Sequence, residues 1–348
     1  MFGLLILSLH SVMSLGHALQ CLDSKGNPVD WYFVYKAPQL AKHADHKFKT
    51  GQGFFYLDKE NTSWTLSTAT IAAKNTAITN TLLQVYANKT SMMYMFYNDQ
   101  SPPMNISETV KGHTKGVVAF DQTSGFWMIH SAPEYPPRKA NGYQWKLSAS
   151  KFGQNFLCVS FPLAQLDVIG HQLYYYQPHV YDHYFPQDFV ARFPILDAII
   201  KGGPVKGPPW FNLTSVTSLR GQSFLSFAKS DNFGDDLYDA LVAPKLQQDL
   251  MVESWMNGPG ESLPSTCSLK YKVYDIDQVS LREDVKFNET IDHSKWAISK
   301  ESPSYWTCAS DINRKSTQFK RAGGCLCLKD QRVWTSFNNI IAHYQPCP

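Results

Sequence analysis

Short stretches of alternating apolar and polar residues, each bounded by Pro, Gly, Asn or Asp, recur in the first half of the chain. This period of two is typical of β-strands, and the bounding residues favour turns. We therefore predict strands over residues 29–35, 91–97, 116–120 and 126–130. The polar run Asp121–Gly125 between the last two predicts a hairpin loop. A further strand is predicted over 271–281.

Helical periodicity is clearer in three other segments. Residues 71–86, 235–255 and 331–344 carry apolar side chains at roughly helical spacing, as at Leu237, Leu241, Leu246 and Leu250. Pro244 should kink or split the middle helix, because proline removes a backbone donor. Together with the strands, these helices predict a mixed α/β fold.

The length of 348 residues and the hydrophobic fraction of 43% allow a sizeable buried core. Only 18% of the residues are charged, and no low-complexity linker divides the chain. One large domain or two of ordinary size are both compatible with this length. The composition excludes a disordered or fibrous protein.

The first eighteen residues are apolar, carry no acidic or basic side chain apart from two histidines, and end in Gly16-x-Ala18. This pattern predicts a cleaved signal peptide over 1–18 and a mature chain over 19–348. No later segment approaches the ~20 apolar residues that span a bilayer. Five Asn-x-Ser/Thr sites are candidate glycosylation sites, which would fit passage through the secretory pathway: Asn61, Asn88, Asn105, Asn212 and Asn288.

Seven cysteines in an oxidising compartment imply up to three disulfides and one residue left over. Their spacing lacks the repeated Cys-x-x-Cys pairs of a zinc site, so a thiolate metal centre is the less favoured interpretation.

The charge balance depends on pH. The formal net charge is +3 with neutral histidines. Nine of the eleven histidines follow residue 18, and protonating all nine would raise the charge toward +12. Such a charge favours phosphate backbones over particular base sequences. Many of these histidines could instead be ordinary surface or core residues.

Two copies of a small motif carry the candidate chemistry, Gly112-His113-Thr114-Lys115-Gly116 and Asp292-His293-Ser294-Lys295-Trp296. Residues i and i+2 of a strand point to the same face, so each histidine should share a ligand with its lysine. A phosphodiester needs a nucleophile, a proton donor and cations around the phosphate oxygens, which two such motifs supply. A lone His-x-Lys commonly lies on a solvated strand face, and the pair by itself leaves both interpretations open. The repetition favours an internal pseudo-duplication.

A set of segments in order along the chain resembles the deoxyribonuclease II family. They are Pro28–Lys36, Tyr97–Asp99, the two motifs above, Gly125–Ser131, Phe227–Ser230, Trp306–Cys308, Asp311–Arg314 and Tyr344–Cys347. The resemblance covers nearly the whole mature chain. It implies a phospholipase D-like fold, in which two similar sheet-and-helix halves, here roughly 19–165 and 166–348, form a pseudo-dimer with a shared active-site cleft.

The resemblance also implies the activity of a secreted or lysosomal acid endonuclease that cuts double-stranded DNA with little sequence specificity and needs no metal or other cofactor. His113, Lys115, His293 and Lys295 would be catalytic. One histidine attacks phosphorus to form a phosphohistidine, the other protonates the leaving 5′ oxygen, and water then releases a 3′-phosphate end. One neutral and one protonated imidazole are needed at once, which mild acid favours. We favour His113 as the nucleophile.

Further residues are candidates for orienting the imidazoles or contacting phosphate. Glu134, Asp311 and Asn313 stand downstream of the motifs, where the superfamily implied by the resemblance places such groups. Asp121 is a poor candidate for contacting Lys115, because six residues of strand separate them by about 20 Å. His130 is either a phosphate contact or a hydrogen-bonded core histidine.

The resemblance implies the disulfides Cys21–Cys158, Cys267–Cys347 and Cys308–Cys327. Two departures from the family bear on this pairing: Ala297 stands where members often have cysteine, and Cys325 is an additional thiol. We therefore expect Cys325 to be free or to exchange with Cys327.

Three other functions compete with an acid nuclease. They are a catalytically weak, toxin-like relative that binds DNA or a cell surface, a phospholipase with the same two-motif chemistry, and a metal-dependent nuclease with histidine ligands.

Overall fold

The computed structural model describes residues 18–87, 92–103 and 111–348. Residues 1–17 of the predicted signal peptide and two of the candidate glycosylation sites, Asn88 and Asn105, lie outside the described residues. Two of the other candidate sites, Asn61 and Asn288, are exposed, and Asn212 is partly exposed on an edge strand.

The first large sheet contains eight antiparallel strands in the order β10-β6-β7-β8-β9-β3-β4-β5. Their bounds are Val180–Tyr184, Met93–Asn98, Lys115–Phe120, Ser124–His130, Gln154–Pro162, Trp31–Lys36, Phe54–Asp58 and Thr65–Leu66. A separate pair, β1 (Cys21–Leu22) and β2 (Pro28–Val29), precedes it. Strand β10 belongs to this sheet, so the sheet continues beyond residue 165, where the first predicted half ends.

The second sheet contains nine strands, with β11-β12-β18-β17-β16-β13-β14-β15 in order and β19 paired to β14. Their bounds are Phe211–Thr217, Ser223–Lys229, Gly323–Lys329, Trp306–Ser310, Trp296–Ser299, Leu250–Glu253, Val273–Arg282, Val285–Asn288 and Ile341–Tyr344. The pairing is antiparallel except between β13 and β14.

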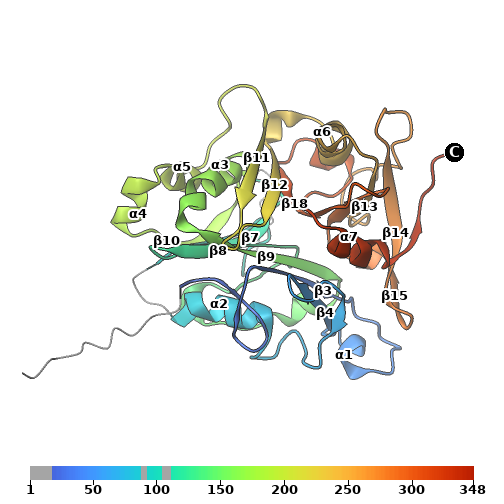
Figure 1. Ribbon diagram of the computed structural model, residues 1–348, viewed down its shortest axis with the longest axis horizontal. Coiled ribbons are helices and arrows are strands. Elements are labelled where there is room, and N and C mark those ends of the chain that lie inside the picture. The colour runs from blue at the N-terminus through green and yellow to red at the C-terminus, as the bar shows by residue number, and fades with distance from the viewer. Residues whose placement is uncertain (1–17, 88–91, 104–110) are drawn as a thin grey trace, which may run out of the picture.

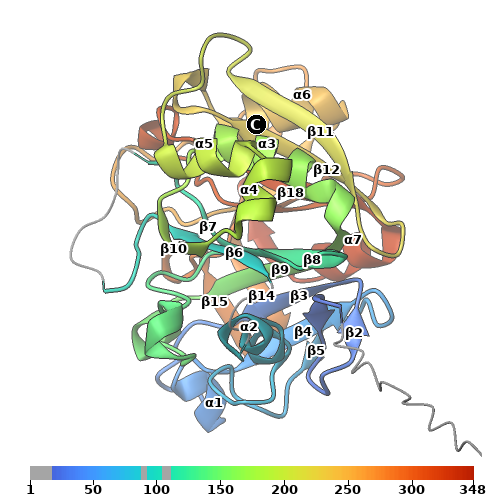
Figure 2. The same cartoon turned by 90° about the vertical axis from the view of Figure 1, so that its left-hand side faces the viewer.

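Helices cover both faces of the first sheet (Figures 1 and 2). Helix α2 (Ala77–Ala87) packs on one face, and α3 (Leu166–Tyr176), α4 (Gln187–Arg192) and α5 (Ile195–Lys201) lie on the other. The remaining helices are α1 (His46–Lys49), α6 (Ala243–Leu246) and α7 (Gln331–Asn338).

One hydrophobic core is shared by the two sheets. It joins Trp127 of the first sheet to Trp296 of the second, with Leu173 of α3 and Phe337 of α7 in the same cluster. Because both faces of the first sheet are covered, β3, β6, β7 and β8 are buried at every residue. The mixed α/β fold class is therefore confirmed. A repeat relating the two halves stays a prediction.

The predicted strands are present, but the hairpin loop is shorter than expected. Strand β8 begins at Ser124 rather than at residue 126. The Asp121 carboxylate accepts hydrogen bonds from the backbone of Thr123 and Ser124, which closes a tighter turn.

All three predicted helices are too long. Helix α2 begins at Ala77 instead of residue 71, because the Thr76 hydroxyl accepts the Thr79 backbone N–H and the chain before it forms turns. Helix α7 ends at Asn338, and 341–344 instead forms β19 against β14.

The predicted 235–255 helix is wrong over its last residues. A π-helical turn, Tyr238–Val242, runs into α6, so the helix does change form next to Pro244. Gln247 then adopts a left-handed backbone that ends the helix, and Leu250 to Glu253 form β13 between β14 and β16. Strand pairing with distant residues outweighs the helical spacing of Leu250.

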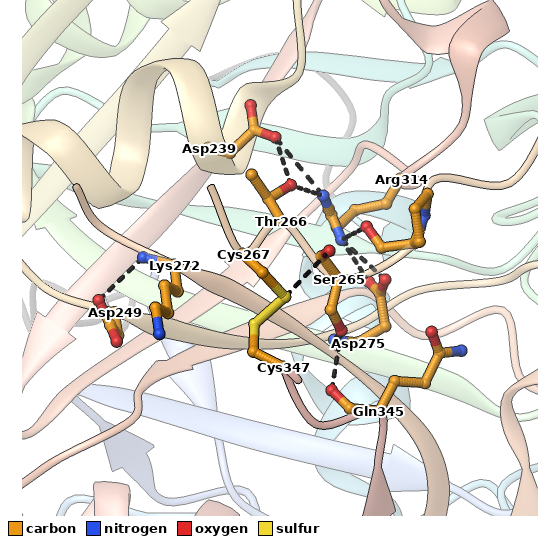
Figure 3. The surroundings of a disulfide bond; sticks show 11 residues. Asp239, Asp249, Ser265, Thr266, Cys267, Lys272, Asp275, Arg314, Gln345 and Cys347 are labelled. Atoms are coloured by element: carbon orange, nitrogen blue, oxygen red, sulfur yellow. Dashed lines mark hydrogen bonds and ion pairs between the residues drawn. A yellow bond between two sulfur atoms is a disulfide. The ribbon is translucent and has the colours of Figure 1, made fainter. Parts of the chain in front are cut away.

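The three disulfides have the pairing that the family resemblance implies: Cys21–Cys158, Cys267–Cys347 and Cys308–Cys327. Cys325 is a buried free thiol. Beside Cys267–Cys347 lies a buried network in which Arg314 donates to both oxygens of Asp275, at 2.7 and 2.8 Å, and to Thr266 (Figure 3). Within the described ranges, no helix is long and apolar enough to cross a bilayer.

Candidate active site

Both His-x-Lys motifs contribute to one pocket. The first lies at the start of β7, of which Lys115 is the first residue, and the second immediately precedes β16. The pocket has a volume of about 120 Å³ and is lined by His113, Lys115, His293 and Lys295. The other lining residues are Asp99, Gln100, Ser131, Trp255, Gly258, Pro259, Asn313, Lys315, Gln318 and Arg321. The structure therefore brings the four predicted catalytic side chains together from two sheets.

The first lysine is held by a buried carboxylate. The Lys115 ammonium donates to Asp99, and Arg321 donates to the second oxygen of Asp99 at 3.0 Å. Burial alone would raise the pKa of Asp99, but the charges of Lys115 and Arg321 outweigh it and hold that pKa well below its usual value. Asp99 therefore stays ionised in acid and fixes both cations.

His113 is fixed at its backbone and at its ring. Its N–H donates to the Ala322 carbonyl at 2.9 Å, and its Nδ1 lies 2.7 Å from Oε1 of Gln318. Desolvation holds its pKa well below the usual value; nearby Lys115 and Lys295 add to this effect, which Asp99 only partly opposes. In the absence of substrate, this imidazole is neutral even in mild acid.

His293 is held between aromatic rings. It stacks on Phe152 with ring centroids 4.1 Å apart and an angle of 10°, and Trp255 contacts it with centroids at 4.3 Å. Its backbone N–H donates to Gly153 at 2.9 Å. Burial, reinforced by Lys295 and Lys115, lowers its pKa to about 2.

The second lysine is less well compensated than the first. Lys295 donates to the carbonyl of His293 at 2.9 Å, and burial followed by repulsion from Lys115 lowers its pKa to about 7. A phosphate anion in the pocket would supply the negative charge that this ammonium lacks.

A buried network anchors the second motif to the first sheet. Tyr35 of β3 donates to Asp292 at 2.5 Å, Ser294 donates to the same oxygen at 2.7 Å, and Trp296 donates to the Tyr35 hydroxyl at 3.2 Å. Because Asp292 and Ser294 flank His293, these bonds fix its position relative to the first motif.

The candidate orienting residues fall into three groups. Asn313 lines the pocket, and its buried Oδ1 has no hydrogen-bond partner among the described residues. His130 and Asp311 line a smaller adjoining void together with His113, Lys115, Ser131 and Lys295. Glu134 lines neither space; its backbone N–H donates to Gln100.

His130 is buried between Phe156 and Tyr135, and neither ring nitrogen bonds to a residue in the described part of the chain. Whether His130 contacts phosphate or is a core histidine stays a prediction. Burial, with Lys115 and Lys295, lowers its pKa to about 3. Burial likewise holds the pKa of Asp311 well above its usual value, even though Lys295 and Lys115 oppose this effect.

Sequence reasoning missed several groups that shape the pocket. Asp99 lies within a segment that resembles the family, directly after β6, but nothing in the local sequence indicates that its carboxylate contacts Lys115. Gln318 and Arg321 lie in the turn between β17 and β18, far from either motif in sequence, so no spacing predicted their contacts.

The pocket is suited to an anion. Among the described residues that line it, Lys115, Lys295, Lys315 and Arg321 are cationic, and the one carboxylate, Asp99, is already paired with two of them. This is a poor donor set for a divalent cation, which prefers free carboxylate oxygens. It suits a phosphate group placed between two imidazoles.

The chain is similar to known proteins along nearly its whole length. The sequence profile of the family Deoxyribonuclease II matches residues 20–347. The chain is 40% identical to deoxyribonuclease-2-alpha of Sus scrofa, over 94% of this chain and 91% of the relative. It is 38% identical to plancitoxin-1 of Acanthaster planci, over 100% and 98% of the two chains, and 34% identical to deoxyribonuclease-2-beta of Homo sapiens, over 99% and 96%.

Proposed function

Because the chain belongs to the deoxyribonuclease II family, we propose that it is an acid endodeoxyribonuclease that hydrolyses the phosphodiester bonds of double-stranded DNA. The observation that carries the proposal is the convergence of His113, Lys115, His293 and Lys295 on one pocket. DNA would be recognised through its phosphates, with little dependence on base sequence.

The reaction proceeds by two displacements at phosphorus. A neutral imidazole attacks and forms an N–P bond, while the P–O5′ bond breaks and the second imidazole donates its proton to the leaving oxygen. Water then attacks phosphorus, loses a proton to the second imidazole, and releases the first histidine and a 3′-phosphate end. Lys115 and Lys295 stabilise the charge on the non-bridging oxygens. This mechanism uses no metal or other cofactor.

The need for acid follows from the electrostatics of the pocket. Desolvation and nearby lysines disfavour the imidazolium form of both histidines. A bound phosphate offsets the lysine charges and restores part of the proton affinity, and low pH supplies the proton for the general acid. Turnover should therefore peak in mild acid and fall when both imidazoles are protonated.

Three further residues complete the proposed site. Asn313 lines the pocket and can contact a phosphate oxygen, while His130 and Asp311 line the adjoining void beside Lys115 and Lys295, where they are candidates for orienting the site or contacting phosphate. Glu134 is the weakest of the four candidates, since it lies outside the pocket lining. The sequons and the predicted signal peptide support delivery through the secretory pathway to the lysosome or the exterior.

A second candidate function is favoured by the similarity to plancitoxin-1 along the whole chain. In this alternative, the protein is a catalytically weak, toxin-like relative that binds DNA. The two complete His-x-Lys motifs support the enzyme instead.

Plasmid nicking at about pH 5 with excess chelator tests the proposal. The nuclease converts supercoiled to nicked DNA under these conditions and leaves phosphatidylcholine intact. Retarded but uncut plasmid would instead support the toxin-like binder. Cleavage that stops on chelation would indicate a metal-dependent nuclease, and release of choline or phosphatidic acid would indicate a phospholipase.

A further inference from the structure

We propose that Gln318 is the positioning residue of His113: its amide oxygen accepts the Nδ1–H of the imidazole and so directs an unprotonated Nε2 toward the scissile phosphorus. The inference rests on the proposed function and assigns different roles to the two histidines of the pocket.

The contact between the two side chains fixes the tautomer. Nδ1 of His113 lies 2.7 Å from Oε1 of Gln318, and both side chains line the pocket. An amide oxygen can only accept a hydrogen bond, so the hydrogen of the neutral ring is on Nδ1. The lone pair is then on Nε2, which is the atom free to attack.

The turn that carries Gln318 is held firmly. Lys229, a fully buried residue at the end of β12, donates to the carbonyls of Gln318 and Phe319 at 2.8 and 3.0 Å. The Gln318 backbone N–H donates to Lys315 at 2.9 Å. The side chain itself is only 6% exposed. A positioning group needs this kind of support, because a small displacement of the imidazole would misdirect the attack.

An amide orients the ring without adding charge. The charged groups that act on His113 are Asp99, Lys115, Lys295 and Arg321, of which only Asp99 favours the imidazolium. A carboxylate at position 318 would join Asp99 in stabilising the protonated ring and would raise the pKa of the nucleophile. With glutamine there, His113 stays neutral at the acid pH where the partner histidine must carry a proton.

The second histidine lacks an equivalent partner. Phe152 stacks on the His293 ring and Trp255 contacts it at a tilt, and the buried Nε2 of His293 has no hydrogen-bond partner among the described residues. This difference assigns the nucleophile to His113 and the general acid to His293.

The isosteric variant Gln318→Glu provides the first test. The acid limb of the pH profile of kcat should move upward by at least one pH unit, so that cleavage well below the limb falls tenfold or more. The basic limb should stay in place. Gln100→Glu is the matched control, because it adds the same charge to the lining of the same pocket without contacting His113. An unshifted acid limb in Gln318→Glu, or an equal shift in both variants, overturns the inference.

A second measurement does not depend on any variant. In the wild-type protein at about pH 5, ¹⁵N NMR of the histidine rings should show His113 with hydrogen on Nδ1. Hydrogen on Nε2 overturns the inference. If the wild-type protein cleaves DNA but the pH profiles or the NMR tautomer differ from these expectations, only the role of Gln318 is contradicted. If the wild-type protein does not cleave DNA, the proposed function is contradicted.

Discussion

The two lysines of the pocket have different partners, so their loss should differ in its effect on stability. The Lys115 ammonium pairs with the buried Asp99, whereas the Lys295 ammonium donates only to a backbone carbonyl among the described residues. Lys115→Met should destabilise the fold by about 3 kcal/mol, since it leaves a buried carboxylate with one cation fewer. Lys115→Met and Lys295→Met should each lower DNA cleavage at least a hundredfold.

Lys295→Met should leave stability at pH 5 equal or higher. Folding lowers the pKa of Lys295 from 10.5 to about 7. Such a lysine destabilises the fold at any pH below its pKa in the unfolded chain, because the unfolded chain binds the proton more tightly. Thermal unfolding of the two variants at pH 5 tests this difference, with a substitution of the exposed Lys286, Lys286→Met, as control. Equal destabilisation by Lys115→Met and Lys295→Met would contradict this account of their partners.

His130 should limit stability in acid. Its folded pKa of about 3 lies below the ordinary 6.5, so its contribution is complete above pH 6.5 and is lost as the pH falls toward 3. His130→Phe keeps an aromatic ring against Phe156 and removes this loss. Relative to wild type, its stability should increase by about 2 kcal/mol between pH 7 and pH 5.

Denaturant unfolding at the two pH values measures this difference. The exposed His171→Gln serves as control and should show little of it. If the free energy of unfolding of His130→Phe differed from that of wild type by the same amount at pH 7 and pH 5, the imidazole would take up its proton in the folded protein as readily as in the unfolded chain.

The four candidate catalytic residues that line the pocket could be singled out from sequence, but the residues that contact them could not. A local motif contains both a histidine and its lysine, so its spacing favours a shared ligand, and the structure places both pairs in the lining of one pocket. Gln318 contacts His113 close to the hydrogen bond from the His113 backbone to Ala322, just before β18, and both contacts join residues more than 200 positions apart. Glu134 was expected near the site and is absent from the lining of either cavity.

Among the secondary-structure elements, strands β17 and β18 hold the disulfide and the odd thiol together. Cys308 of β17 and Cys327 of β18 are directly opposite in register. Cys325 also lies on β18, and its sulfur is 3.6 Å from that of Cys327. Burial raises the pKa of Cys325 above its ordinary value, so little thiolate forms and exchange is suppressed. We expect Cys308–Cys327 with Cys325 as the free thiol.

Peptide mapping under non-reducing acid conditions can establish this pairing. Cys325→Ser should retain the same three bridges and the wild-type activity. A dominant Cys308–Cys325 or Cys325–Cys327 bridge in the wild-type protein would contradict the expected pairing.

Four strands of the first sheet and β14 of the second could be predicted from alternating apolar and polar residues, whereas β9 of the first sheet and the other strands of the second sheet were not. Helix ends could not be located in the same way. The segments 250–253 and 341–344 follow helices and carry apolar residues, yet they become strands because β14 offers them backbone partners. Such pairing is a property of the folded sheet and leaves no local trace in the sequence.

Across the whole molecule, DNA capture should depend on pH less than the histidine count suggests. Desolvation keeps His113, His130 and His293 neutral in the free protein, so the expected rise toward +12 is not reached in mild acid. DNA binding should still tighten as the pH falls from about 7 to 5 and should weaken steeply with salt.

Fluorescence anisotropy with the inactive His113→Ala variant measures this binding without cleavage. In stronger acid, affinity should keep rising while wild-type turnover falls, because turnover needs a neutral nucleophile. A flat binding curve over this range would leave lysine and arginine alone to account for capture.

The central claim is a covalent two-histidine reaction, and trapping the intermediate tests it most directly. Excess enzyme is mixed with duplex DNA at about pH 5 with chelator, quenched in alkaline detergent within milliseconds, digested and analysed by mass spectrometry. The account predicts a 3′-phosphoryl DNA fragment attached to the peptide that contains His113. His113→Ala should give no adduct and, like His293→Ala, should cleave several orders of magnitude more slowly than wild type. Wild-type cleavage without an adduct on either histidine, or near-normal cleavage by a folded His113→Ala variant, would contradict it.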